Sequence, residues 1–308
     1  MSRGIARLLT AIACSTFLGA CRYGWGIEHA PFIDGPGPGS GWVRVSVEGI
    51  RYDVDLHIPR RRTPGEAPTP LLVVLHGYNG TGPGMERRTG FSALADSAGF
   101  AVAYPNARKN AQGKRAWMGG DAAALDLAML RALTDTVAHR VRVDRARVFL
   151  AGFSNGGALT YRAALALPND YAGIGVVAGA YRPDTGALRM GSMGGSVRAI
   201  PLLAVHGTHD ETVVFDRSAP LAIHAWARRN GCDVAPATDT LAAGAIIRTA
   251  YSSCRARARV VLYALVNEGH GWPRRRIGNS RFFAASTLWS FFSEYGTRDS
   301  LVGVDRRP

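Results

Sequence analysis

Short runs of consecutive apolar residues recur along most of the chain. They occupy residues 70–75 ("PLLVVL"), 101–104, 148–150, 174–178, 202–205 and 260–266. Runs of this length without polar alternation are typical of strands buried on both faces of a sheet. Residues 42–59 differ, because apolar and polar positions alternate on either side of Glu48-Gly49. That pattern predicts an antiparallel hairpin with a tight turn at this dipeptide.

Stretches with helical spacing lie between these predicted strands. The stretches are residues 127–137, 159–167 and 221–230, and a last one with Ala285, Leu288, Trp289 and Phe292 at i, i+3, i+4 and i+7. Strands that alternate with helices predict a three-layer α/β fold with a mostly parallel central sheet, opened here by an antiparallel hairpin. No repeat or linker interrupts the pattern after residue 42, so residues 42–308 are predicted to form one domain.

The first 41 residues have a different character. Arg3 and Arg7 precede the apolar stretch 8–20, which is too short to span a bilayer and is typical of a secretion signal. The sequence Leu18-Gly19-Ala20-Cys21 resembles the bacterial lipobox, in which the cysteine becomes lipidated. We therefore expect a signal peptide at 1–20, lipidation of Cys21 and a flexible tether at 21–41; simple secretion and an uncleaved anchor are the alternatives. The expected location is extracytoplasmic, either secreted or anchored in the bacterial cell envelope.

Cysteine content and charge extend this picture. Cys14 would leave with the signal and Cys21 would carry lipid, so Cys232 and Cys254 remain as a pair. In an oxidising compartment a disulfide is the default, and two buried free thiols are the alternative. The net charge of +14 suits an anionic envelope polymer, although arginine can also be a general choice for solvated positions. The sequence lacks zinc-finger spacing and a basic helix with interleaved aromatic residues, which disfavours nucleic acid.

One glycine-rich turn carries a serine directly after the apolar run 148–150. Gly152-Phe153-Ser154-Asn155-Gly156 matches the pattern G-x-S-x-G, and it lies between a predicted strand and a predicted helix. In that context the glycines relieve a tight turn that leaves the serine oxygen exposed at the start of the helix. Ser154 is therefore a candidate nucleophile, and an ordinary glycine-rich turn is the alternative.

Three further polar groups follow other predicted strands. His76-Gly77-Tyr78 follows 71–75, and the backbone N–H groups of Tyr78 and Asn155 are candidates to bind an oxyanion. Asp210 follows 202–205 and His270 follows 260–266; Glu211 and Asp216 are less well placed acids. The order serine, acid, histidine is that of the triad in α/β-hydrolases. His206 and His209 lack a convincing metal-ligand spacing, so no metal and no cofactor is expected.

These segments together resemble a known group of enzymes. The segments "LLVVLHGYNG" (71–80), "RVFLAGFSNGGALTYRAAL" (147–165), "PLLAVHGTHDETV" (201–213), "RRNGC" (228–232) and "LVNEGHGWP" (265–273) are similar to those of esterases related to polyhydroxybutyrate depolymerases and feruloyl esterases, in the α/β-hydrolase superfamily. The resemblance covers about residues 42–295. It implies a triad of Ser154, Asp210 and His270, and a disulfide between Cys232 and Cys254. The chain departs from it at Asn267-Glu268-Gly269, where relatives often carry a longer glycine run.

The resulting expectation is a secreted serine carboxylesterase that hydrolyses a small or oligomeric ester. An acyltransferase or peptidase with the same triad is the first alternative, and a catalytically idle envelope-binding protein is the second. Trp272 is expected to wall a substrate pocket, although a core tryptophan would look the same in the sequence. Arg274-Arg275-Arg276 follows at once and either rims the site or forms a solvated loop.

Overall fold

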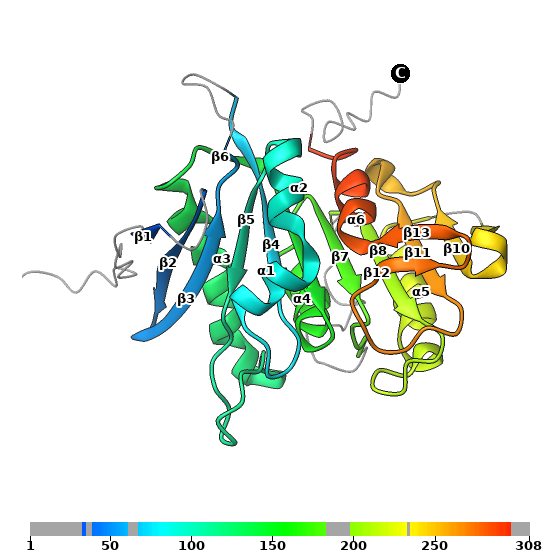
Figure 1. The fold of residues 1–308 in the computed structure, drawn as a ribbon, viewed down its shortest axis with the longest axis horizontal. Helices are drawn as coiled ribbons and strands as arrows, with labels where there is room; N and C mark the ends of the chain where they lie inside the picture. The colour runs from blue at the N-terminus through cyan, green and yellow to red at the C-terminus, as the bar shows by residue number, and fades with distance from the viewer. Residues whose placement is uncertain (1–32, 35–38, 61–66, 183–197, 233–234, 297–308) are drawn as a thin grey trace, which may run out of the picture.

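The computed structural model describes residues 33–34, 39–60, 67–182, 198–232 and 235–296. The expected signal peptide, Cys21 and most of the expected tether lie outside these residues, but Ile33–Asp34 and residues 40–41, which we assigned to the tether, lie in strands of the sheet. A single sheet of eleven strands runs through the described part, in the order β1-β2-β3-β5-β4-β6-β7-β8-β11-β10-β9. A separate two-stranded sheet pairs β12 with β13. Figure 1 shows the large sheet extending across the whole molecule.

The six central strands run parallel to one another. They are β5 (Ala101–Pro105), β4 (Thr69–Leu75), β6 (Val143–Phe153), β7 (Gly173–Val177), β8 (Leu202–Gly207) and β11 (Val260–Leu265). Every residue of β4, β5, β7 and β8 is buried, as the uninterrupted apolar runs predict. The mostly parallel centre and the α/β class are therefore confirmed.

Antiparallel strands extend the sheet at both ends. On one side β1 (Ile33–Asp34), β2 (Ser40–Val47) and β3 (Ile50–His57) precede β5, and on the other β10 (Ile246–Tyr251) and β9 (Ala237–Leu241) follow β11. The predicted hairpin is β2–β3, and Val47 pairs with Ile50 across Glu48 and Gly49. Both turn residues have positive φ angles, 49° and 76°, which is the geometry of a two-residue hairpin turn.

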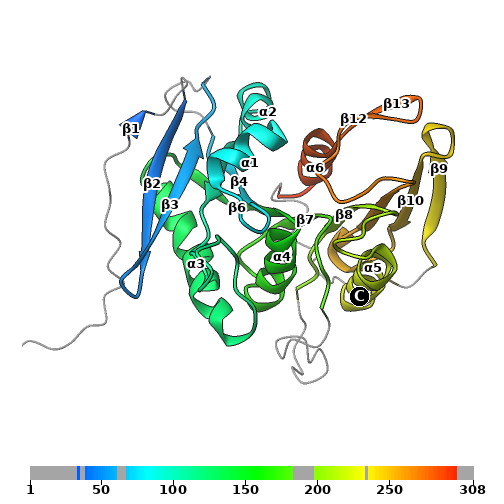
Figure 2. The same ribbon diagram turned by 60° about the horizontal axis from the view of Figure 1, so that its bottom comes forward.

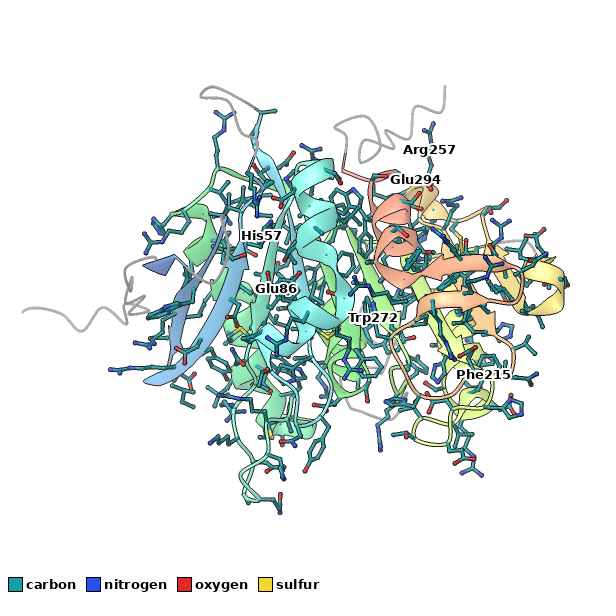
Figure 3. The ribbon with its side chains drawn as sticks, in the orientation of Figure 1. His57, Glu86, Phe215, Arg257, Trp272 and Glu294 are labelled. Carbon is teal, nitrogen blue, oxygen red and sulfur yellow. A yellow bond between two sulfur atoms is a disulfide. The ribbon has the colours of Figure 1, made fainter. Side chains whose placement is uncertain are left out.

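Helices cover both faces of the sheet. One layer contains α3 (Ala124–Ala138), α4 (Asn155–Ala166) and α5 (Ala219–Arg229), and the other contains α1 (Gly82–Thr89), α2 (Phe91–Ala98) and α6 (Ala284–Phe292). Figure 2 shows the two layers on opposite sides of the strands. Each layer packs on its own apolar core. Trp226 is buried in the first core and Phe292 in the second. The second core also contains Trp272, which Figure 3 labels.

Two features depart from the sequence prediction, although neither changes the fold class. The segment 82–98, for which we predicted no helix, forms α1 and α2. The segment 274–283, for which we predicted no strand, forms the hairpin of β12 (Arg274–Ile277) and β13 (Ser280–Phe283). No helix among the described residues is long and apolar enough to cross a membrane.

Candidate active site

Ser154 lies at the sharp turn between β6 and α4. Its backbone φ and ψ angles are 54° and −116°, a strained conformation for a residue with a side chain. The flanking glycines allow this turn to pack closely: a Cβ on Gly152 would lie 2.3 Å from the carbonyl oxygen of Gly156. A Cβ on Gly156 would lie 2.6 Å from the carbonyl oxygens of Leu75 and His76. The glycine-rich stretch is therefore a strand-to-helix elbow that presents the serine, as the pattern predicts.

Ser154, His270 and Asp210 form one hydrogen-bonded chain. The Nε2 atom of His270 lies 2.9 Å from the Oγ atom of Ser154, and its Nδ1 atom lies 2.7 Å from Oδ2 of Asp210. Because the carboxylate can only accept, Nδ1 carries the proton and Nε2 is available to take one from the serine. The structure thus brings together three residues that are 56 and 60 positions apart in the sequence.

Sheet topology explains this convergence. The three residues follow β6, β8 and β11, which are parallel to one another. The strands β8 and β11 are neighbours, and they pair from Leu202 with Val260 to Gly207 with Leu265. The carboxyl ends of parallel strands meet at one edge of a sheet, where such folds bind ligands. Asp210 is held there by two backbone N–H groups, since its Oδ1 atom accepts from Thr212 and Val213 at 2.9 and 2.8 Å.

The expected oxyanion donors lie beside the serine. A Cβ on Gly77 would lie 3.3 Å from the Cβ of Ser154, so the loop that carries Tyr78 passes directly over the nucleophile. Asn155 is the first residue of α4, where backbone N–H groups have no partner within the helix. In the described part of the chain, no hydrogen bond from the backbone N–H of Tyr78 or Asn155 is recorded. Their role in binding an oxyanion stays a prediction.

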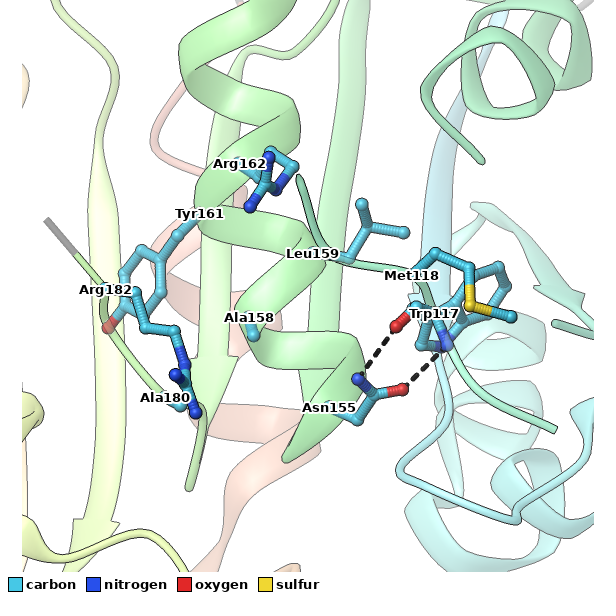
Figure 4. A pocket seen from close by; sticks show the side chains of 10 residues that line it. Trp117, Met118, Asn155, Ala158, Leu159, Tyr161, Arg162, Ala180 and Arg182 are labelled. Carbon is cyan, nitrogen blue, oxygen red and sulfur yellow. Dashed lines mark hydrogen bonds between the residues drawn. The ribbon is translucent and has the colours of Figure 1, made fainter. Parts of the chain in front are cut away.

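A buried network that the sequence did not predict fixes this loop. The Asn155 side chain accepts from the Trp117 N–H at 2.8 Å and donates to the Trp117 carbonyl at 3.0 Å, as Figure 4 shows. The indole N–H of Trp117 in turn donates to the carbonyl of His76 at 2.8 Å. These bonds tie the loop after β4 to the first turn of α4. Asn155 therefore contributes its side chain to the site, in addition to the role that we predict for its backbone N–H.

His76 supports the same loop as a neutral imidazole. Its Nδ1–H donates to the Gly77 carbonyl at 2.7 Å, and its Nε2 accepts from the backbone N–H of Ala107 at 3.0 Å. The side chain is 1% exposed, and this burial lowers the pKa of His76 to about 4. The tautomer is fixed by its two partners, and the ring orients backbone rather than titrating near neutral pH.

His206 acts on the acid of the triad rather than on a metal. Its Nε2 atom lies 3.1 Å from Oδ2 of Asp210 and 2.8 Å from the carbonyl oxygen of Val213. Both partners are acceptors, so Nε2 carries the proton, and burial lowers the pKa of His206 and keeps the ring neutral. The single Nε2–H of His206 is therefore shared between the Val213 carbonyl and Oδ2 of Asp210, which also accepts from His270. Among the described residues no cluster of His, Cys, Asp and Glu is arranged to hold a metal ion.

Trp272 lies beside the triad but is largely a core residue. It is 8% exposed and its ring packs edge-on against Phe91 at 5.9 Å between centroids. It also lines a cavity together with His270, Glu268 and Arg275. Arg275 is ion-paired with Glu268, whereas Arg274 donates to the carbonyl of Arg87. The structure therefore leaves the expected substrate contact of Trp272 as a prediction.

Cys232 and Cys254 form a disulfide, as expected. It joins the chain just after α5 to the segment after β10. Nearby, the backbone N–H of Arg255 donates to the carbonyl of Asn230 at 3.0 Å. The bridge thus connects two loops that already lie side by side.

The fold and the arrangement of Ser154, His270 and Asp210 define the protein as an α/β hydrolase with a serine triad. Residues 61–201 match the family model described as "Esterase PHB depolymerase". The match covers somewhat under half of the chain, and it agrees with the resemblance of the motifs to esterases of this family.

Individual esterases are similar to the chain in sequence or in fold. The chain is 29% identical over 170 residues to a bifunctional acetylxylan esterase/xylanase of Neocallimastix patriciarum, covering 55% of this chain and 23% of that protein. It is 29% identical over 171 residues to feruloyl esterase C of Emericella nidulans, covering 54% of this chain and 57% of the other. The solved acetyl xylan esterase from Aspergillus awamori has a TM-score of 0.60 at 17% identity, over 79% of this chain and 94% of that one, which shows the shared fold. The chain thus spans about a quarter to somewhat over half of these curated relatives.

Proposed function

We propose that the protein is a serine carboxylesterase that hydrolyses carboxylic esters through an acyl-enzyme. The observation that carries this proposal is the hydrogen-bonded chain from Ser154 through His270 to Asp210, with Ser154 half-buried at its elbow. An incidental serine at a glycine-rich turn would not meet a histidine that is itself oriented by a buried carboxylate.

The geometry supports a two-step reaction. Oγ of Ser154 attacks the ester carbonyl carbon while Nε2 of His270 takes the hydroxyl proton, and the imidazolium is stabilised by Asp210. The carbonyl oxygen, now negative, is held by the N–H groups of Tyr78 and Asn155. His270 then protonates the departing alcohol. Water, deprotonated by the same histidine, attacks the acyl-enzyme, releases the carboxylic acid and restores Ser154.

The test compares the wild type with Ser154→Ala on short-chain nitrophenyl esters, methyl ferulate and hydroxybutyrate oligomers. We expect the substitution to lower kcat by at least about a thousandfold, because only oxyanion binding would remain. Ser290→Ala is the matched control, since Ser290 is exposed on α6. Equal hydrolysis by the wild type and Ser154→Ala would overturn the serine mechanism, and release of the acyl group only onto an added acceptor would favour an acyltransferase.

We also propose that the protein is exported and anchored in the bacterial cell envelope through Cys21. The apolar stretch 8–20 followed by Cys21 supports this, as does the disulfide, because such bonds persist in oxidising compartments. Mass spectrometry of the native N-terminus should find a lipid-modified Cys21, and an unmodified residue there would contradict the anchor. The net charge of +14 supports a further, salt-reversible attachment to anionic envelope polymers.

A further inference from the structure

One buried carboxylate holds both ends of the irregular segment 108–118. This is Asp126, which lies on the first turn of α3 and is fully buried. Its Oδ1 atom accepts from Nε of Arg108 at 3.3 Å, and its Oδ2 atom accepts from the backbone N–H of Met118 at 2.8 Å. The hydroxyl of Tyr52, on β3, also donates to Oδ1, at 3.0 Å. A buried carboxylate with three donors is fixed in position, so the segment is closed at its base.

This segment binds the loop that carries Tyr78 on both sides of that residue. Before Tyr78, the carbonyl of His76 accepts from the indole N–H of Trp117 at 2.8 Å. After Tyr78, the backbone N–H of Asn79 donates to the carbonyl of Arg115 at 2.7 Å. In the described part of the chain, the backbone N–H of Tyr78 itself has no hydrogen-bond partner. It is therefore held between two bound neighbours and remains free to donate.

Trp117 also binds the residue that carries the second expected donor. Its backbone N–H donates to the side chain of Asn155 at 2.8 Å, and its carbonyl accepts from the same side chain at 3.0 Å (Figure 4). Asn155 is the first residue of α4, and its backbone N–H is the one expected to bind the oxyanion. Trp117 is 3% exposed, so it makes these bonds largely away from solvent. One residue therefore connects the two loops that carry the expected donors.

We propose that Trp117 and Asp126 are positioning residues that hold the oxyanion hole in its reactive geometry before the substrate binds. The inference rests on the proposed esterase function and on the predicted roles of Tyr78 and Asn155. Donors that already point to the developing charge stabilise the transition state more than the bound ester. Their displacement therefore lowers kcat rather than raising KM. Asp126 acts through the segment 108–118, and Trp117 acts through the two loops that it connects.

Trp117→Phe tests the proposal by removing one hydrogen bond and keeping an aromatic ring. The bond that is lost joins the indole to the carbonyl of His76, whereas the backbone bonds with Asn155 remain. We expect kcat on a nitrophenyl ester to fall at least about tenfold, with a change in KM below about twofold. Complete loss of one oxyanion donor lowers kcat by about 100- to 1000-fold, and a displaced donor loses part of that.

Trp226→Phe is the matched control. The indole N–H of Trp226 also donates to a backbone carbonyl, that of Ile200 at 3.0 Å, and its ring is also buried. Ile200 precedes β8, so this bond lies at the edge of the sheet opposite to the triad. We expect Trp226→Phe to lower the free energy of unfolding about as much as Trp117→Phe does, but to keep the wild-type kcat. Equal losses of kcat in the two variants, or a wild-type kcat in Trp117→Phe, would overturn the proposal.

Asp126→Asn tests the base of the segment. An amide has one accepting oxygen, so it cannot accept both from Met118 on one side and from Arg108 on the other. We expect kcat to fall and KM to change little. Asp144→Asn is the control, because Asp144 also accepts from a backbone N–H and from Arg147, at 3.0 and 2.8 Å, but near the start of β6. A folded Asp126→Asn variant with the wild-type kcat would contradict the part of Asp126, and the Trp117→Phe comparison decides the proposal if this variant does not fold.

Labelling with a fluorophosphonate separates this proposal from the esterase function. Oγ of Ser154 attacks phosphorus, His270 takes the hydroxyl proton, fluoride leaves, and the phosphoryl oxygen occupies the oxyanion hole, so labelling does not depend on which ester is hydrolysed. We expect Trp117→Phe to be labelled at least about tenfold more slowly than the wild type, and Trp226→Phe at the wild-type rate. Slower labelling of Trp117→Phe in a protein that hydrolyses no ester would contradict the proposed function alone. Ester hydrolysis with equal labelling rates in the wild type and Trp117→Phe would contradict the positioning role alone.

Discussion

At the scale of single residues, the acid of the triad is held by more partners than the sequence suggests. Asp210 is buried, and its two oxygens accept from Thr212, Val213, His270 and His206. A buried carboxylate with so many donors is fixed in position, and it can orient His270 without moving during the reaction. The contacts with Thr212 and Val213 are local and that with His206 depends on a ring four residues earlier on β8, whereas His270 lies 60 residues later in the sequence.

Replacing His206 should therefore reduce turnover more than substrate binding. We expect His206→Phe to lower kcat by about tenfold with little change in KM, because Asp210 loses a hydrogen bond to a charged group. His206→Gln retains an N–H donor and should recover part of the loss. Steady-state kinetics on a nitrophenyl ester measures both effects. Equal losses in the Phe and Gln variants would show that the ring matters only for packing.

At the scale of elements, the central strands could be predicted because burial on both faces leaves a continuous apolar run. The edge strand β9 is mostly exposed and has no such run, so nothing distinguishes it from a loop. The helix α1 (GPGMERRT) contains two glycines and a proline and has weak helical propensity. It forms because Thr81 caps its first turn and Met85 packs into the core. Tertiary contacts, rather than local pattern, decide these elements.

The packing of α6 on β7 gives a test at this scale. Gly173 and Gly175 lie two residues apart on β7 and face the same way. A Cβ on Gly175 would lie 2.4 Å from Cδ2 of Leu288, whereas a Cβ on Gly173 would meet its nearest neighbours at 3.6 Å. Gly175→Ala should lower the free energy of unfolding by about 1–3 kcal/mol through overpacking.

Gly173→Ala is the control for this comparison. It has room for a methyl group, so its free energy of unfolding should stay within about 0.5 kcal/mol of the wild type. Urea unfolding followed by circular dichroism measures both variants. Similar values for the two would mean that α6 can shift away from β7, and that the close approach is not a packing constraint.

At the scale of the whole molecule, the triad was predictable and its support was not. Ser154, Asp210 and His270 each follow a recognisable strand, so their order in the sequence already implies their meeting at one sheet edge. Trp117 lies in an irregular segment, 38 residues before Asn155, and its bonds to Asn155 and His76 depend on where that segment runs. Loop paths are set by tertiary packing, which leaves no period in the sequence.

The pH dependence of stability combines two groups with opposite effects, the buried His76 and the half-buried Asp55, which accept hydrogen bonds from the neighbouring residues Ala107 and Asn106. The pKa of His76 is lowered from 6.5 to about 4 by burial, so the unfolded chain binds a proton there first and the native state loses stability as pH falls from about 6.5 to 4. The pKa of Asp55 is raised from 3.8 to about 6, by burial above all and also by Glu86 and Asp53. Here the native state binds the proton first, so stability rises as pH falls through the same range.

The contributions of His76 and Asp55 to the pH dependence of the free energy of unfolding oppose each other in the wild type, and single substitutions should separate them. His76→Gln removes a loss of at most about 3 kcal/mol, so its free energy of unfolding should rise relative to the wild type between pH 7 and pH 4. Asp55→Asn removes the stabilisation that protonation of Asp55 gives the native state. The free energy of unfolding of this variant should therefore fall relative to that of the wild type between pH 7 and pH 4. Urea unfolding at pH 7, 5.5 and 4 measures these differences. Three parallel curves would mean that neither group titrates differently in the native and unfolded states, and hence that the His76 ring is not held neutral by the loop that carries Tyr78.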